Sequence, residues 1–140
     1  MSEPIRYTYT VDGDDFMSAG SASADVKRVL RQLGFPSDAI RRTAIAMYEG
    51  EINMVIHAQG GLATVDIYGD HVDIKLEDHG PGIPNLELAM SEGWSTASDK
   101  IRDLGFGAGM GLPNMKKYSN EMRIDTVVGT GTTVYMTIQV

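Results

Sequence analysis

Two spacings of apolar positions alternate along the chain and predict the order of its elements. Residues 5 to 11 alternate between apolar and polar side chains and are rich in β-formers, which predicts a strand. Apolar residues then recur at three- and four-residue steps between residues 15 and 33, which predicts a helix ending at Gly34. The residues of this stripe are Phe16, Ala19, Ala22, Val26, Val29, Leu30 and Leu33.

The clearest periodic segment predicts a second helix, which begins at Ser37 and stops at Gln59-Gly60-Gly61. Its apolar stripe consists of Ile40, Ala44, Ile45, Tyr48, Ile52, Val55 and Ile56. Beside this stripe, Glu49, Asn53 and His57 follow one another at four-residue steps. Residues four apart share one side of a helix, so these three form a polar ridge.

The rest of the chain predicts hairpins with helices between them. The expected elements are strands 62–68 and 71–78 around a Gly69-Asp70 turn, a short helix 85–91, an irregular segment 92–111, a helix 112–120, and strands 121–128 and 132–140 around a Gly-Thr-Gly turn. We expect one domain over residues 1–140. Its predicted class is α/β (α+β), a two-layer sandwich with a mixed β-sheet and helices on one face.

Composition narrows the classes of function. The 140 residues carry a formal net charge of −7, which opposes non-specific nucleic-acid binding and attachment to an anionic membrane surface. The absence of cysteine excludes disulfides, thiolate metal sites and a cysteine nucleophile. Neither a signal peptide nor a run of about 18 apolar residues is visible, so we expect a soluble cytoplasmic protein.

An aspartate lies on the apolar side of a predicted strand. Val72, Ile74 and Leu76 share one face of strand 71–78, and Asp78 has the same parity. A buried carboxylate is costly unless a donor bonds it, and the amino group of an adenine is such a donor. Thr132 shares the inward parity of the last strand, so its hydroxyl could bond Asp78 or a bridging water. The alternative is that both residues lie at strand ends and reach solvent.

Two glycine-rich segments are candidates for ligand contact. Gly80 and Gly82 follow Asp78 in the segment Asp78 to Ile83, where the missing side chains permit close backbone approach. Glycines alternate again from Gly105 to Leu112, directly before a predicted helix, whose N–H groups suit a phosphate chain. No Gly-Lys-Ser/Thr follows, so this is not a Walker A loop. A plain surface loop remains the alternative.

The polar ridge of the second helix carries two groups that suit phosphoryl chemistry. The Asn53 side chain offers a hard neutral oxygen to Mg²⁺. Glu49, one turn earlier, could take a proton from a hydroxyl nucleophile. The alternative is that the ridge only marks the solvent side of an amphipathic helix.

Taken in order, these pieces resemble the Bergerat-type ATP-binding domain of gyrase, the heat-shock chaperone, histidine kinases and mismatch-repair ATPases. The motifs are Glu49-Gly50-Glu51-Ile52-Asn53, Asp78-His79-Gly80-Pro81-Gly82-Ile83, the run from Gly105 to Leu112, and Gly129-Thr130-Gly131-Thr132. Residues 77–84 with Gly93-Trp94-Ser95-Thr96 resemble the stressosome-type switch kinases, whereas His57 resembles the anti-sigma branch. The polar stretch from Ala97 to Leu104 departs from the shortest stressosome-type pattern.

The resemblance implies a role for each matched residue. Asp78, supported by Thr132, would accept the adenine amino group, and Asn53 would ligate Mg²⁺. Glu49 would be the general base toward a substrate Ser or Thr. The residues implied in nucleotide contact and in a mobile lid are Gly80, Gly82, Ile83, Gly105, Gly107, Gly109, Gly111 and Leu112.

The function implied is that of an ATP- and Mg²⁺-dependent protein serine/threonine kinase acting as a regulatory switch. The implied substrate is a STAS-domain protein, with a sigma factor or phosphatase regulator as further candidate partners and a homodimer as a candidate assembly. The alternative is an ATP/ADP-binding anti-sigma switch that sequesters its partner, and Glu49 separates the two because sequestration needs no base. An ATPase fragment and a histidine kinase fit less well, since no transducer or phospho-accepting hairpin is seen.

Overall fold

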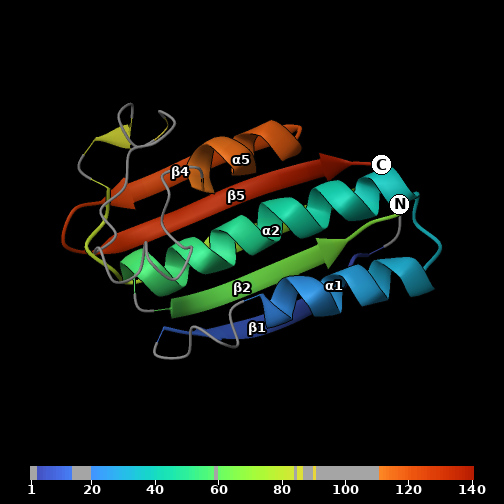
Figure 1. Cartoon of the computed structure of the whole chain (residues 1–140), viewed down its shortest axis with the longest axis horizontal. Coiled ribbons are helices and arrows are strands. Elements are labelled where there is room, and N and C mark those ends of the chain that lie inside the picture. Colours follow the sequence, from blue (N-terminus) through green and yellow to red (C-terminus); the bar gives the residue numbers. More distant parts are fainter. Residues whose placement is uncertain (1–2, 14–19, 59, 84, 87–89, 91–110) are drawn as a thin grey trace, which may run out of the picture.

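The computed structural model describes residues 3–13, 20–58, 60–83, 85–86, 90 and 111–140 (Figure 1). The elements within this part of the chain are β1 (Ile5–Asp12), α1 (Ser21–Gln32), α2 (Ser37–Ala58), β2 (Gly60–Ile67), β3 (His71–Glu77), α5 (Gly111–Tyr118), β4 (Glu121–Val127) and β5 (Gly131–Gln139). Their kinds and order agree with the sequence-based expectation. In the expected helix 85–91, the described contact is the N–H of Met90 donating to the carbonyl of Leu86 over 2.9 Å, a helical spacing.

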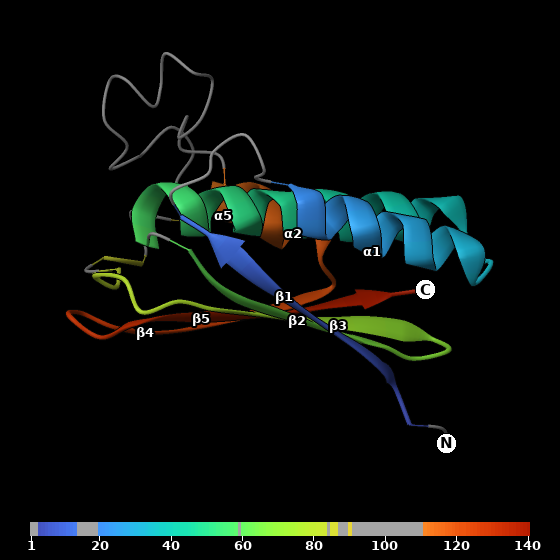
Figure 2. The same ribbon diagram turned by 90° about the horizontal axis from the view of Figure 1, so that it is seen from below.

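The strands form one five-stranded sheet in the order β1-β2-β3-β5-β4, and α1, α2 and α5 all cover the same face (Figure 2). The two-layer α+β architecture is thus confirmed. The expected mixture of parallel and antiparallel strands is wrong, because every pairing in the sheet is antiparallel. In the described residues, α1 and α2 lie between β1 and β2 along the chain. Strand β2 begins beside the end of β1, where Gly60 pairs with Asp12.

The core lies between the sheet and the helices α1, α2 and α5. Alternate residues of the central strands point at the helices and are buried, while their neighbours face solvent on the other side. The buried apolar side chains of the three central strands are Ala63, Val65, Ile67, Val72, Ile74, Leu76, Val134, Met136 and Ile138. This alternation fixes the register of each strand, because a one-residue slip would turn the whole apolar set toward water.

The side of α2 that faces the core matches the predicted apolar stripe only in part. The buried residues of that stripe are Ile40, Ile52 and Val55. Met47 and Met54 are buried, as is Gly50, whereas Tyr48 of the expected stripe is 41% exposed. The cause is the close approach of α2 to the sheet: a Cβ on Gly50 would lie 2.1 Å from Cδ1 of Leu76. The helix therefore turns its smallest residue, flanked by flexible methionines, toward the sheet.

Helix α1 ends as expected but begins in an unexpected way. Gly34, with φ of +80°, follows the helix, and the Phe35 N–H bonds the carbonyl of Leu30, which is a Schellman ending. At the other end, the N–H groups of Gly20, Ala22 and Ser23 donate to the carboxylate of Glu51 in α2 at 3.0, 3.3 and 2.6 Å. A buried acid on one helix thus caps the free N–H groups of another.

Among the described helices, none is long and apolar enough to cross a bilayer. The longest, α2, includes the charged residues Arg41, Arg42, Glu49 and Glu51.

Candidate functional site

Asp78 follows β3 directly and is tied to β5. The main-chain N–H groups of Thr132 and Gly80 donate to its Oδ1 at 3.1 and 2.9 Å, and its own N–H donates to the carbonyl of Thr132. Both side-chain bonds end on Oδ1. In the described part of the chain, Oδ2 is therefore the oxygen left to accept a hydrogen bond from a ligand, as an adenine amino group requires.

The Thr132 hydroxyl does not bond Asp78 in this structure; it pairs with the Thr126 hydroxyl of β4 at 2.8 Å. Thr126 also accepts the N–H of Ile83 at 2.8 Å, so a short polar chain links β5, β4 and the segment after Asp78. Thr126 has the inward parity of β4, like Met122 and Ile124, and that parity could have identified it from the sequence.

Gly80 and Gly82 are required by packing within the protein. A Cβ on Gly80 would lie 2.7 Å from Cβ of Ala58 at the end of α2. Gly82 has φ of +79°, and a Cβ there would lie 2.6 Å from the carbonyl oxygen of Val127. The segment after Asp78 is therefore held between α2 and the end of β4, which fixes its path beside the carboxylate.

Asn53 and Glu49 of α2 face the first turn of α5. A Cβ on Gly111 would lie 2.9 Å from Oδ1 of Asn53, so the absent side chain of Gly111 makes room for the Asn53 amide. One turn along, Nδ2 of Asn114 donates to Oε1 of Glu49 over 3.4 Å. The two residues proposed for chemistry thus lie together against the turn where the glycine-rich run ends.

Glu49 lies in a partly buried environment that disfavours its charge. Burial raises the pKa of its carboxyl above the ordinary value, while the hydrogen bond from Asn114 acts in the opposite direction. A carboxylate with a raised pKa remains basic enough to take a proton from a hydroxyl. No group of three or more His, Asp or Glu side chains in the described residues is arranged to hold a metal. The expected Mg²⁺ would thus rely on Asn53 together with water and phosphate oxygens.

The other predicted residues have varied outcomes. The side chain of Leu112 is buried in the core, and Ile83 packs against it, which leaves their main chains for any ligand contact. Gly105, Gly107 and Gly109 lie outside the described residues, as do the segment 91–110 and the side chain of His57. Sequence reasoning missed Glu51 and Asn114, whose partners are 28 to 31 and 65 residues away along the chain.

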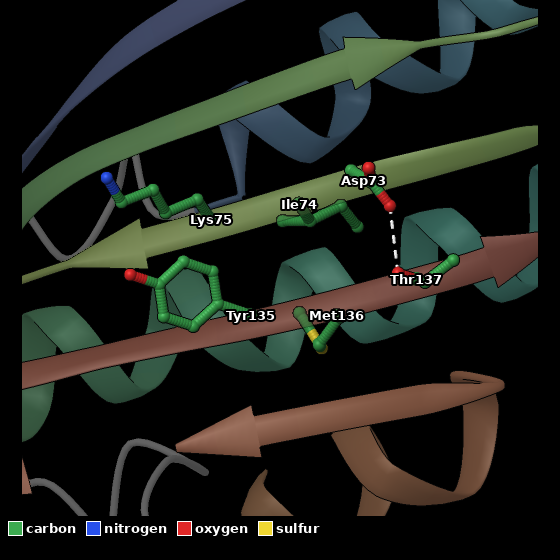
Figure 3. Close-up of a pocket in the computed structure, with 6 residues that line it drawn as sticks. All are labelled: Asp73, Ile74, Lys75, Tyr135, Met136 and Thr137. Atoms are coloured by element: carbon green, nitrogen blue, oxygen red, sulfur yellow. Dashed lines mark hydrogen bonds between the residues drawn. The ribbon is translucent and has the colours of Figure 1, made fainter. Parts of the chain in front are cut away.

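A shallow hollow of about 190 Å³ lies elsewhere, on the sheet between β3 and β5 (Figure 3). Its lining residues are Asp73, Ile74, Lys75, Tyr135, Met136 and Thr137. The Thr137 hydroxyl donates to Asp73 at 2.8 Å, and Lys75 lies over the Tyr135 ring. None of the predicted site residues lines this hollow.

Comparison with known proteins gives the same family on independent grounds. Residues 38–140 match the model of the histidine kinase-, DNA gyrase B- and HSP90-like ATPases. The serine/threonine-protein kinase RsbT of Bacillus subtilis is 30% identical over 112 residues, which cover 77% of this chain and 78% of that protein. An anti-sigma F factor of Bacillus licheniformis is 27% identical over 142 residues, covering 95% of this chain and 88% of the relative.

A solved structure supports the fold. The crystal structure of the RsbU and RsbW domains of Rv1364c from Mycobacterium tuberculosis superposes with a TM-score of 0.66 at 19% identity. The superposition covers 96% of this chain and 32% of that longer chain. The likeness therefore concerns one domain of the larger protein.

Proposed function

This chain belongs to the family of histidine kinase-, DNA gyrase B- and HSP90-like ATPases, and we propose that it transfers the γ-phosphate of ATP to a Ser or Thr hydroxyl of a partner protein. The observation that carries the proposal is the contact between the α2 ridge and α5. Glu49 and Asn53 lie against Asn114 and Gly111, the first turn after the glycine-rich run. A base and a metal ligand are thereby held beside a helix start that suits phosphate.

The adenine end of the site is assigned to Asp78. Its Oδ2 is the acceptor offered to the exocyclic amino group, while Thr132 and Gly80 hold Oδ1. One oxygen of the carboxylate is thus bonded within the protein, and the other is the acceptor proposed for the adenine amino group. Thr132 supports the site through its main chain, and its hydroxyl belongs to the Thr126 pair.

The phosphate end is assigned to Asn53 and Glu49. When bound, Mg²⁺ neutralises charge on the phosphate oxygens, and the Asn53 carbonyl oxygen is the side-chain ligand proposed for it. Glu49 accepts the proton of the substrate hydroxyl as that oxygen bonds to the γ-phosphorus, and the bond from phosphorus to the ADP oxygen breaks. Positioning and charge neutralisation supply most of the rate, so few side chains are needed.

The proposed substrate is a STAS-domain protein, with a sigma factor or a phosphatase regulator as a further partner and a homodimer as the assembly. Relatives named as a serine/threonine kinase and as anti-sigma F factors support a switch of this kind. The anti-sigma F names also favour a second candidate, a nucleotide-binding switch that sequesters its partner without transferring phosphate.

The test is transfer of labelled phosphate from ATP to STAS-domain proteins encoded in the same genome, for the wild type and for Glu49→Gln. The variant keeps the shape of the side chain but cannot take a proton at neutral pH. We expect near-normal ATP affinity and transfer slowed by about 10²–10⁴. Glu77→Gln, a surface change in the Lys75 ion pair, is the matched control. Normal transfer by Glu49→Gln would show that the kinase mechanism is wrong and favour sequestration.

A further inference from the structure

Helices α2 and α5 lie side by side and run in opposite directions (Figure 1). Two contacts follow from this antiparallel arrangement. Gly111 at the start of α5 lies against Asn53, and Asn114, one turn further along α5, bonds Glu49, one turn earlier in α2. The first turn of α5 therefore reaches Asn53 and Glu49 at once. Glu49 faces the Asn114 amide from α5, and from its own helix its polar neighbour one turn on is Asn53.

Helix α5 has apolar contacts with the core besides the bond from Asn114. The helix is anchored by Leu112 and Met115, which are 7% and 1% exposed in the core. The Asn114 side chain points instead at α2, where its Nδ2 donates to Oε1 of Glu49. The contact leaves Oε2 of Glu49 as the oxygen for a substrate proton.

We propose that Asn114 is a positioning residue for Glu49, whose amide fixes Oε1 so that Oε2 meets the substrate hydroxyl. The proposal rests on the proposed function of Glu49 as the general base. A glutamate side chain turns about three bonds, and an anchor on one oxygen removes most of that freedom. At 3.4 Å the bond is long for an N–H to oxygen hydrogen bond.

The chemistry of an amide suits this position. An amide NH₂ group can donate to a carboxylate but neither ionises nor accepts a proton near neutral pH, so it does not compete for the substrate proton. A lysine in its place would bring a full positive charge and lower the pKa of Glu49 much further, which would weaken the base. The hydrogen bond from the amide lowers the pKa of Glu49 and so offsets part of the effect of burial, which raises it.

The first test follows the Glu49 carboxyl by carbon-13 NMR during a pH titration of the full chain. Asn114→Leu removes the donor at similar size, and Asn114→Asp replaces it by a like charge. We expect the pKa of Glu49 to rise in both variants, because each loses the bond that favours the ionised form. Lys116→Gln, on the exposed side of α5, is the control and leaves the titration unchanged. A Glu49 titration that is the same in wild type and Asn114→Leu overturns the proposal.

The second test measures transfer to the STAS-domain substrate. Asn114→Leu should lower kcat about tenfold, the scale of one hydrogen bond to a charged group, with the KM for ATP unchanged. The acid limb of its pH profile should move to higher pH, and Asn114→Gln should recover part of the rate. Equal losses in kcat and ATP affinity would indicate a structural role and overturn the proposal. A normal rate in Glu49→Gln would instead overturn the proposed function, while the titration still reports on the Asn114 contact.

Discussion

The main-chain N–H of Thr132 donates to Oδ1 of Asp78 over 3.1 Å, so β5 holds the side chain that follows β3. These residues lie 54 positions apart in the chain but next to one another in the sheet. The bond continues the pairing of β3 with β5 beyond its last pair, Glu77 and Thr133. The orientation of the carboxylate is consequently a property of the sheet and is set before any nucleotide arrives.

Asp78→Asn is expected to fold normally and to lose nucleotide affinity. The Asn oxygen can still accept the N–H groups of Thr132 and Gly80, but an NH₂ donor then replaces the free acceptor. We expect ADP binding to weaken by about 1.5–3 kcal/mol, the range for a hydrogen bond to a charged group. Calorimetry on the folded variant measures this loss. Asp73→Asn on the outer face is the control, and equal ADP affinity for wild type and Asp78→Asn would remove Asp78 from the site.

Asn53→Ala is expected to separate the metal from the base. The Asn53 amide lies against Gly111 and, in the described part of the chain, makes none of the hydrogen bonds found at Asp78, so removing it should weaken Mg²⁺-dependent ATP binding and leave adenosine binding nearly intact. Titrations of ATP with and without Mg²⁺, beside adenosine alone, distinguish the two. A parallel loss for both ligands would mean that Asn53 only supports the structure.

Glu51→Gln is expected to destabilise the fold although Glu51 is two residues from Glu49. In the wild type, three N–H groups donate to the Glu51 carboxylate, at a site only 2% exposed. In the variant, one carboxylate oxygen is replaced by an NH₂ donor, which cannot accept from them. A buried unsatisfied donor costs about 1–3 kcal/mol, so we expect a loss of about 3 kcal/mol in the free energy of unfolding. Urea denaturation measures it. The exposed pair of Lys75 and Glu77 provides the comparison, where Glu77→Gln should cost less than about 1 kcal/mol.

Gly50→Ala tests how closely α2 approaches the sheet. The added methyl group would lie 2.1 Å from Cδ1 of Leu76 and 3.3 Å from Cε of Met115. Overpacking of this kind costs about 1–3 kcal/mol, and it should lower the melting temperature. Gly69→Ala has no atom within 4 Å of the new methyl and serves as the control. An unchanged melting temperature for Gly50→Ala would mean that α2 moves away from Leu76 at no cost.

Local patterns were enough for the elements. Gly34 marked the end of α1, and Asp78 follows β3 directly, as expected. The role of Asp78 toward adenine stays a prediction.

The buried side of α2 was predicted only in part: Ile52 and Val55 are buried, but Tyr48 is 41% exposed. A hydrophobic period counts tyrosine as an inward residue. It has no means of placing a glycine or a threonine there, yet Gly50 and Thr43 are buried.

Contacts between distant residues were beyond local patterns. A glutamate in a helix is ordinarily expected to be exposed to solvent, but Glu51 is buried. Its partners are main-chain N–H groups at the start of α1, which no particular side chain marks in the sequence. The pair of Asn114 and Glu49 joins two helices 65 residues apart. Neither could be inferred without the tertiary fold. The contribution of Gly105, Gly107 and Gly109 stays a prediction.

The turn of α2 from Glu49 to Glu51 has a consequence for how such proteins diverge. Glu49 contacts α5, Gly50 packs against the sheet and Glu51 bonds the start of α1, so each of these three adjacent positions is constrained by a different part of the fold. A descendant that abandoned phosphate transfer and kept nucleotide-dependent binding would be free to exchange the residue at position 49. It would still have to retain Gly50 and Glu51, because the fold depends on both. In a lineage tree, loss of the acid at position 49 with the next two residues unchanged would therefore mark the branches where a kinase became a switch without catalysis.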